Sequence, residues 1–232
     1  MKEMKLSYYT DIKAQHMIRT LLLVVCLLGV LGCKKNVTSE VVLYSNDFES
    51  NKLGDIYNGH IEAFNGGHIL GRYNNEEFQL VLNNLPEHIL VEVSFDLNIH
   101  DSWDGNTTLY SNIGGPDIWK LNIDKNNYIT TTFSNGYCGV GVFCAPQSYP
   151  ANYLNSNNNP KAGASRIDLP GVCNDAGIVG GTTQYRISKT IQHSGRTLLI
   201  QGIDELIQEN AEDKKCDESW SIDNITVKAI NL

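Results

Sequence analysis

The feature that most constrains this 232-residue chain is an alternation of apolar and polar side chains over residues 89–100. Every odd position from Ile89 to Ile99 is apolar, and every even position from Glu92 to His100 is polar. Successive side chains of a β-strand point to opposite faces, whereas on a helix this pattern would be scattered around the axis. The segment therefore predicts a long strand with one face in a hydrophobic core.

Further stretches with the character of strands recur along the chain. The last of them changes its apolar parity between Ile222 and Ile225, which predicts a β-bulge at Asp223–Asn224. Residues 134–183 lose the pattern and are rich in Gly, Asn, Pro and Ser, so we expect a disulfide-pinned insertion there. About ten strands and no convincing helix predict an all-β fold, an antiparallel β-sandwich. The expected strands are residues 41–49, 68–73, 77–82, 89–99, 119–123, 128–133, 184–192, 196–203 and 219–230.

The amino-terminal region has the marks of an export signal. Leu21–Leu31 is an apolar run of eleven residues. As a helix it would span about 16 Å, too short for a hydrocarbon core of about 30 Å, and it fits the apolar part of a secretory signal peptide. The chain before Met17 is long and mixed in charge for such a signal, so we expect translation to begin at Met17.

The end of the apolar run, Val-Leu-Gly-Cys, resembles the lipobox of bacterial lipoproteins. This resemblance implies a signal peptide over residues 1–32, a lipidated Cys33 and a polar tether over 33–40, followed by one domain over 41–232. A plain signal peptide with an incidental cysteine is the alternative. We therefore expect an exported protein that is lipid-anchored to the bacterial cell envelope. Residue 34 is a lysine and not the aspartate that marks retention in the inner membrane of some bacteria, which favours the outer membrane.

Charge and cysteines support this compartment. Removing residues 1–32 removes four basic and two acidic side chains, which leaves a formal charge of −10 and argues against nucleic acid as a partner. Four cysteines then remain besides Cys33, and in an exported domain they predict two disulfides with three possible pairings. We favour Cys138–Cys144, which flanks a short Gly-rich turn, and Cys173–Cys216. Zinc is the competing interpretation, but no Cys-x₂-Cys spacing is present.

Two terminal motifs point to a family of sandwiches. Asn46–Glu49 (NDFE) and Ser219–Val227 (SWSIDNITV) resemble the first and last strands of jelly-roll carbohydrate-binding modules and related galactose-binding-like or concanavalin A-like lectin-type domains. The resemblance implies a jelly roll with its terminal strands side by side. It also implies a structural calcium ion held by Asp47, Glu49 and Asp223. Alternatively, these carboxylates bond local backbone N–H groups at strand ends.

The long strand runs into an acidic loop that is a second candidate site. Asp101, Trp103, Asp104 and the later Asp117 form a set in which the indole could stack on a sugar ring and the carboxylates could accept hydroxyl protons. The same loop could instead hold a second calcium ion. The structural alternative is that Trp103 closes the end of the core and the aspartates cap the turn.

Together these features favour a binding module over an enzyme. The paired carboxylates of concanavalin-like glycosidases, the hydrolase nucleophile motif, the zinc-protease motif and the phosphate-binding glycine loop are all missing from the sequence. We therefore expect a lipid-anchored, calcium-stabilised module that binds a glycan or an extracellular protein and attaches to the membrane only through its lipid. A polysaccharide hydrolase with carboxylates assembled from distant loops is the runner-up. An envelope structural protein without a small ligand is the third possibility.

Overall fold

The computed structural model describes residues 36–107, 115–141, 144–207 and 211–232. The chain divides into two compact units, and the larger, Thr38–Asn231, contains all the described strands. The signal segment, Met17 and Cys33 lie outside the described residues, so export and lipidation remain predictions. Within the described part, no helix has both the length and the apolar character needed to span a bilayer.

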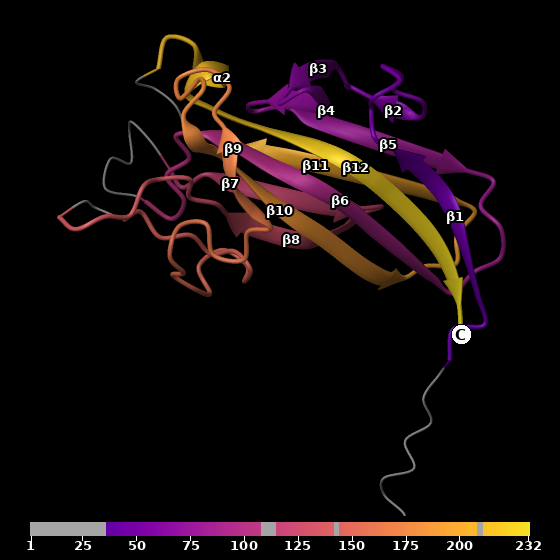
Figure 1. The fold of residues 1–232 in the computed structure, drawn as a ribbon. Coiled ribbons are helices and arrows are strands. Elements are labelled where there is room, and N and C mark those ends of the chain that lie inside the picture. The colour runs from indigo at the N-terminus through magenta and orange to yellow at the C-terminus, as the bar shows by residue number, and fades with distance from the viewer. Residues whose placement is uncertain (1–35, 108–114, 142–143, 208–210) are drawn as a thin grey trace, which may run out of the picture. The chain divides into compact units, whose positions relative to one another are not determined.

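Two antiparallel sheets form the predicted sandwich (Figure 1). The larger sheet has the order β3-β4-β12-β6-β10-β9, with β1 also pairing to β12, and the smaller has the order β2-β5-β11-β7-β8. The strands of the larger sheet are β1 (Ser39–Asn46), β3 (Ile61–Phe64), β4 (Gly67–Tyr73), β6 (Leu90–Asp101), β9 (Arg166–Pro170), β10 (Val179–Gln192) and β12 (Glu218–Asn231). Those of the smaller sheet are β2 (Ile56–Tyr57), β5 (Glu77–Asn83), β7 (Ile118–Ile123), β8 (Asn126–Thr132) and β11 (Thr197–Glu205).

The strand predicted from the alternation is β6, which lies in the middle of the larger sheet between β10 and β12. Its odd-numbered side chains from Val91 to Ile99 are fully buried between the sheets. Because two neighbouring strands pair along nearly its whole length, β6 fixes the register of the larger sheet. The prediction of a long strand with one core face is confirmed.

The core also contains a group of aromatic rings that depends on one glycine. Trp119 of β7 and Trp220 of β12 meet edge to face, with their ring centroids 5.8 Å apart. A Cβ atom on Gly202 of β11 would lie 2.6 Å from Phe78 Cε1 and 3.0 Å from Trp220 Cη2. The absent side chain at residue 202 therefore makes room for these two rings.

The terminal strands behave as the motifs predicted. Strands β1 and β12 pair antiparallel, with Asn46 opposite Ile225. The register of β12 against β6 shifts between Asp223 and Thr226, which confirms the predicted bulge. Both predicted disulfides are present, Cys138–Cys144 and Cys173–Cys216.

Three strands escaped the sequence analysis, so the described residues contain twelve strands rather than about ten. Strands β2 and β3 are two and four residues long, too short to show an alternation. Strand β9 lies inside the predicted insertion, where it pairs with the start of β10. The insertion is therefore partly built into the larger sheet. The one described helix, α2 (Lys214–Asp217), has four residues.

Candidate functional site

The tryptophan of the acidic loop belongs to the core. Trp103 has no exposed surface, and its Nε1 donates a hydrogen bond to the Ser219 carbonyl oxygen at 2.9 Å. Its ring meets Phe133 edge to face. A buried ring cannot stack on a sugar, so the prediction of a ligand-binding role for Trp103 is wrong. The structural alternative, in which this residue closes the end of the core, is the one that the structure supports.

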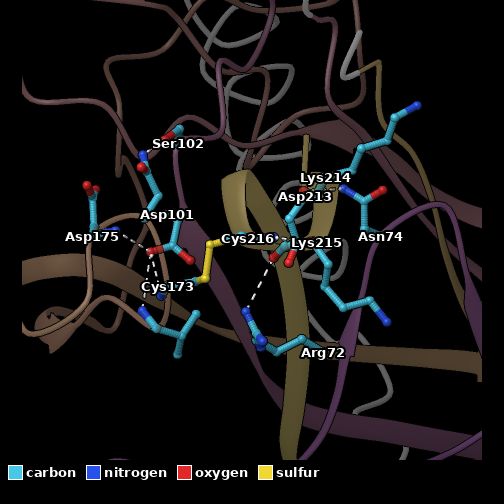
Figure 2. The surroundings of a disulfide bond; sticks show 12 residues. Arg72, Asn74, Asp101, Ser102, Cys173, Asp175, Asp213, Lys214, Lys215 and Cys216 are labelled. Carbon is cyan, nitrogen blue, oxygen red and sulfur yellow. Dashed lines mark hydrogen bonds between the residues drawn. A yellow bond between two sulfur atoms is a disulfide. The ribbon is translucent and has the colours of Figure 1, made fainter. Parts of the chain in front are cut away.

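Asp101 also faces inward and anchors a turn (Figure 2). Its Oδ1 accepts hydrogen bonds from the backbone N–H groups of Val172 at 3.2 Å, Cys173 at 3.4 Å and Asp175 at 3.1 Å. Burial raises the pKa of Asp101, while these three donors act in the opposite direction. Because the same turn carries the Cys173–Cys216 disulfide, Asp101 fastens it to the end of β6. The predicted ligand-binding role is wrong for this residue too, since only 1% of its surface is exposed.

Asp117 organises the acidic loop from within. It is fully buried, and its Oδ2 accepts hydrogen bonds from the backbone N–H groups of Asp104 and, at 3.0 Å, Gly105. Burial raises the pKa of its carboxyl. Asp117 is therefore not available to a ligand. Of the four predicted residues, Asp104 alone is exposed.

The predicted calcium ligands lie near one another, but Asp47 and Glu49 interact with other groups of the protein. Asp47 is exposed and accepts the Glu49 N–H, while Glu49 accepts the His68 N–H at 2.9 Å and contacts its Nδ1 at 3.2 Å. The pKa of Asp223 is raised to about 6 by burial and then by the carboxylates of Asp96, Glu49 and Asp47. Among the residues that the structure describes, no three His, Cys, Asp or Glu side chains are grouped to hold a metal ion. Calcium binding stays a prediction.

A cleft of about 430 Å³ opens at the side of the sandwich, between β8 and β10. Strand β8 ends the smaller sheet, and β9 pairs with β10 only as far as Gln184. The part of β10 beyond that point lines the cleft together with β8. Its lining residues are Tyr128, Ile129, Tyr149, Pro150, Asn152, Arg186, Ile187, Ser188 and Lys189.

One wall of this cleft is held rigidly by hydrogen bonds to β8. The Tyr149 N–H donates to the Thr132 carbonyl oxygen at 3.2 Å, and the Tyr153 N–H donates to the Thr130 carbonyl oxygen at 2.7 Å. Asn152 Oδ1 accepts the Thr130 N–H at 3.3 Å. The Tyr149 ring packs on Phe133, with centroids 5.0 Å apart. The wall is thus formed before any ligand arrives.

The aromatic rings of the cleft are accompanied by cations. Lys189 Nζ lies 5.8 Å from the centroid of the Tyr128 ring, within the range of a cation–π interaction. Arg186 is exposed over 58% of its side chain and pairs with Asp96 through Nη1 at 3.0 Å. The cleft therefore offers two partly buried tyrosine rings, an amide and positive charge. Such a set can stack on a ring and hydrogen-bond to its substituents.

The sequence analysis missed this cleft because one wall of it comes from residues 149–152, inside the patternless insertion. The rest of the lining comes from β8 and β10, whose residues Tyr128 and Lys189 are 61 positions apart in the sequence. The residue that could have indicated the cleft was Tyr128, because an aromatic side chain near the start of an edge strand leaves part of its ring accessible to a ligand.

No family model and no curated protein matches this chain. Similar solved structures include a family 35 carbohydrate-binding module from Clostridium thermocellum, 12% identical, covering 82% of this chain and 98% of that chain, with a TM-score of 0.33. The CBM22-2 xylan-binding domain of Paenibacillus barcinonensis Xyn10C is 11% identical, covering 81% and 99%, with a TM-score of 0.36. The K2 adhesin domain of Lys-gingipain is 13% identical, covering 82% and 98%, with a TM-score of 0.35.

The first two are carbohydrate-binding modules, the class that the terminal motifs resemble. At these TM-scores, the fold class of this chain rests on its own strand pairing. Fold and cleft together define a β-sandwich domain with a preformed, aromatic-lined cleft at one sheet edge.

Proposed function

We propose that this domain is an exported binding module that holds a segment of a glycan chain in the cleft between β8 and β10. The observation that carries the proposal is the preformed cleft with the Tyr128 and Tyr149 rings in its lining. Its volume of about 430 Å³ falls within the range of small-ligand sites, about 300–1,000 Å³. A tyrosine combines an apolar ring face with a hydroxyl, which suits the mixed apolar and polar surface of a sugar.

The residues that line the cleft also favour binding over hydrolysis. Hydrolysis of a glycosidic bond needs two carboxyl groups flanking that bond, and the described lining of the cleft contains none. The buried carboxyl pair of Asp117 and Glu218 has almost no exposed surface and cannot reach a polysaccharide. A binding module without catalysis is therefore the function that fits the described residues.

Attachment to the membrane and calcium form the remaining parts of the proposal. The lipid anchor at Cys33 is supported by the apolar segment Leu21–Leu31 and the lipobox-like sequence at its end, and the outer-membrane location by Lys34. A calcium ion bound by Asp47, Glu49 and Asp223 would compensate the neighbouring carboxylates that, together with the larger effect of burial, raise the pKa of Asp223. Glu49 would have to turn from His68 to join such a site.

The test is binding of the full chain to a broad glycan and polysaccharide array, followed by titration of the ligands found. Tyr128→Ala should weaken binding at least tenfold, whereas Tyr128→Phe, which keeps the ring, should stay within a few-fold of the wild type. Tyr57 on β2 is 61% exposed and lies outside the cleft, so Tyr57→Ala is the matched control. Equal binding by the Tyr128→Ala and wild-type proteins would refute the assignment of the cleft.

A further inference from the structure

We propose that the glycan held in this cleft is anionic, with carboxylate or sulfate groups that meet Lys189 and, to a lesser extent, Arg186. This inference rests on the proposed function and specifies the ligand class of the same cleft.

The charge of the cleft contrasts with that of the whole molecule. The chain has a formal net charge of −8, with 26 acidic and 18 basic side chains. Lys189 and Arg186 are nevertheless the charged residues in the described lining of the cleft. Other hollows on the described surface follow the overall balance: one is lined by Glu76 and Glu77, another by acidic residues that include Asp213.

The position of Lys189 explains why its charge is directed into the cleft. In the register of β10 against β6, Lys189 lies opposite Val93, whose side chain is buried in the core. Lys189 therefore lies on the inner face of its sheet, at a rim where the smaller sheet has ended. Its ammonium group lies by the Tyr128 ring, and within the described part of the chain it has no carboxylate partner in an ion pair. A bound anion would supply the missing counter-charge.

Arg186 plays a smaller part because its charge is already shared. It lies opposite Asp96 in the same register and forms an ion pair with that carboxylate on the outer face of the sheet. One of its five N–H groups is used in this pair. The others could reach an anionic substituent of a chain that crosses the rim of the cleft. Lys189 and Arg186 thus lie three residues apart on β10, one on the inner and one on the outer face of the sheet.

Several properties of the binding follow from this arrangement. A partly buried ammonium beside a ring attracts an anion more strongly than a fully exposed lysine, because the surrounding water screens less. The stacking on Tyr128 and the charge contact at Lys189 would act on the same sugar unit. Binding of an anionic chain should therefore weaken as the salt concentration rises, while binding of a neutral chain should not.

The test is titration calorimetry of the full chain with three soluble polysaccharides: a polyuronate, a sulfated galactan and a neutral mannan. We expect the wild type to bind an anionic chain at least tenfold more tightly than the neutral one. Lys189→Gln should lose at least tenfold of that affinity, and Lys189→Arg should restore most of it. Lys52→Gln, an exposed lysine in the β1–β2 loop, changes the net charge equally and should stay within twofold of the wild type.

The outcomes separate this inference from the proposed function. Preference for the polyuronate or for the sulfated galactan identifies the anionic group. If the neutral mannan binds equally well and Lys189→Gln has no effect, the anionic inference is overturned, while a loss on Tyr128→Ala still supports glycan binding in the cleft. If no glycan binds in a manner that depends on Tyr128, both proposals fall.

Discussion

Replacing Asp101 by alanine is expected to destabilise the domain rather than to abolish ligand binding directly. The carboxylate accepts three backbone N–H groups from the turn that includes Cys173 and Asp175. The residue also has a φ of 62°, in the left-handed region that aspartate and asparagine tolerate better than alanine. Asp101→Ala removes the acceptor and places an unsuitable residue in this conformation.

The magnitude follows from these two effects. Each lost hydrogen bond costs about 1 kcal/mol, since water can replace part of it at this half-buried turn. Alanine in the left-handed region costs about 1 kcal/mol more, so the free energy of unfolding should fall by about 4 kcal/mol. For a domain of this size, 1 kcal/mol shifts the melting temperature by roughly 2–4 °C, and the expected loss is therefore roughly 8–16 °C.

Thermal unfolding followed by circular dichroism, with the disulfides intact, measures this effect. Asp101→Asn keeps an acceptor oxygen and tolerates the backbone conformation, so it should lose about 1 kcal/mol. Asp104→Ala makes the same substitution at an exposed position of the same loop and should change the melting temperature little. An Asp101→Ala protein that melts within 2 °C of the wild type, or an Asp101→Asn protein that is equally destabilised, would refute the reasoning.

Three further predictions concern stability. Replacing Cys173 and Cys216 by alanine opens a loop of 43 residues and should cost about 4 kcal/mol in urea unfolding. Gly202→Ala should cost about 1–3 kcal/mol in the same assay, because its Cβ would meet the Phe78 ring. The pKa of Asp223 is raised to about 6, so its contribution to stability is present below about pH 4 and lost as the pH rises through 6. In EDTA, Asp223→Asn should therefore reduce the change of the melting temperature with pH. At pH 7, added calcium should raise the melting temperature of the wild type but not that of Asp223→Asn.

The sheet framework was predictable because its signal is local. In β6 the alternation runs from Val91 to His100 and is reinforced by burial of one face, so the strand and its inner face follow from the sequence. The bulge at Asp223 could be found for the same reason, since a shift in parity is visible within a few residues.

The candidate site was less predictable because it depends on contacts between distant segments. Whether Trp103 faces solvent or core depends on Phe133 and Ser219, which lie 30 and 116 positions away. The alternation ends at His100, before this tryptophan, so the pattern gave no orientation for it. The acidic residues around it suggested an exposed loop, but the carboxylates of Asp101 and Asp117 turn inward and accept backbone N–H groups. A charged residue in a sequence indicates a side chain that needs hydrogen-bond partners, and backbone N–H groups of the same protein can supply them.

The acidic loop, although it does not face a ligand, is connected to the proposed cleft through backbone contacts. Asp117 holds Gly105 in place, and the next residue, Asn106, donates its N–H to the Pro146 carbonyl oxygen at 2.7 Å. Three residues beyond Pro146 lies Tyr149, in the wall of the cleft. The carboxylates selected from the sequence thus act as positioning residues: they fix the insertion against the ends of the strands, and the insertion presents the aromatic wall. A rigid wall loses little conformational freedom on binding, which is the advantage of anchoring a binding loop with buried charges.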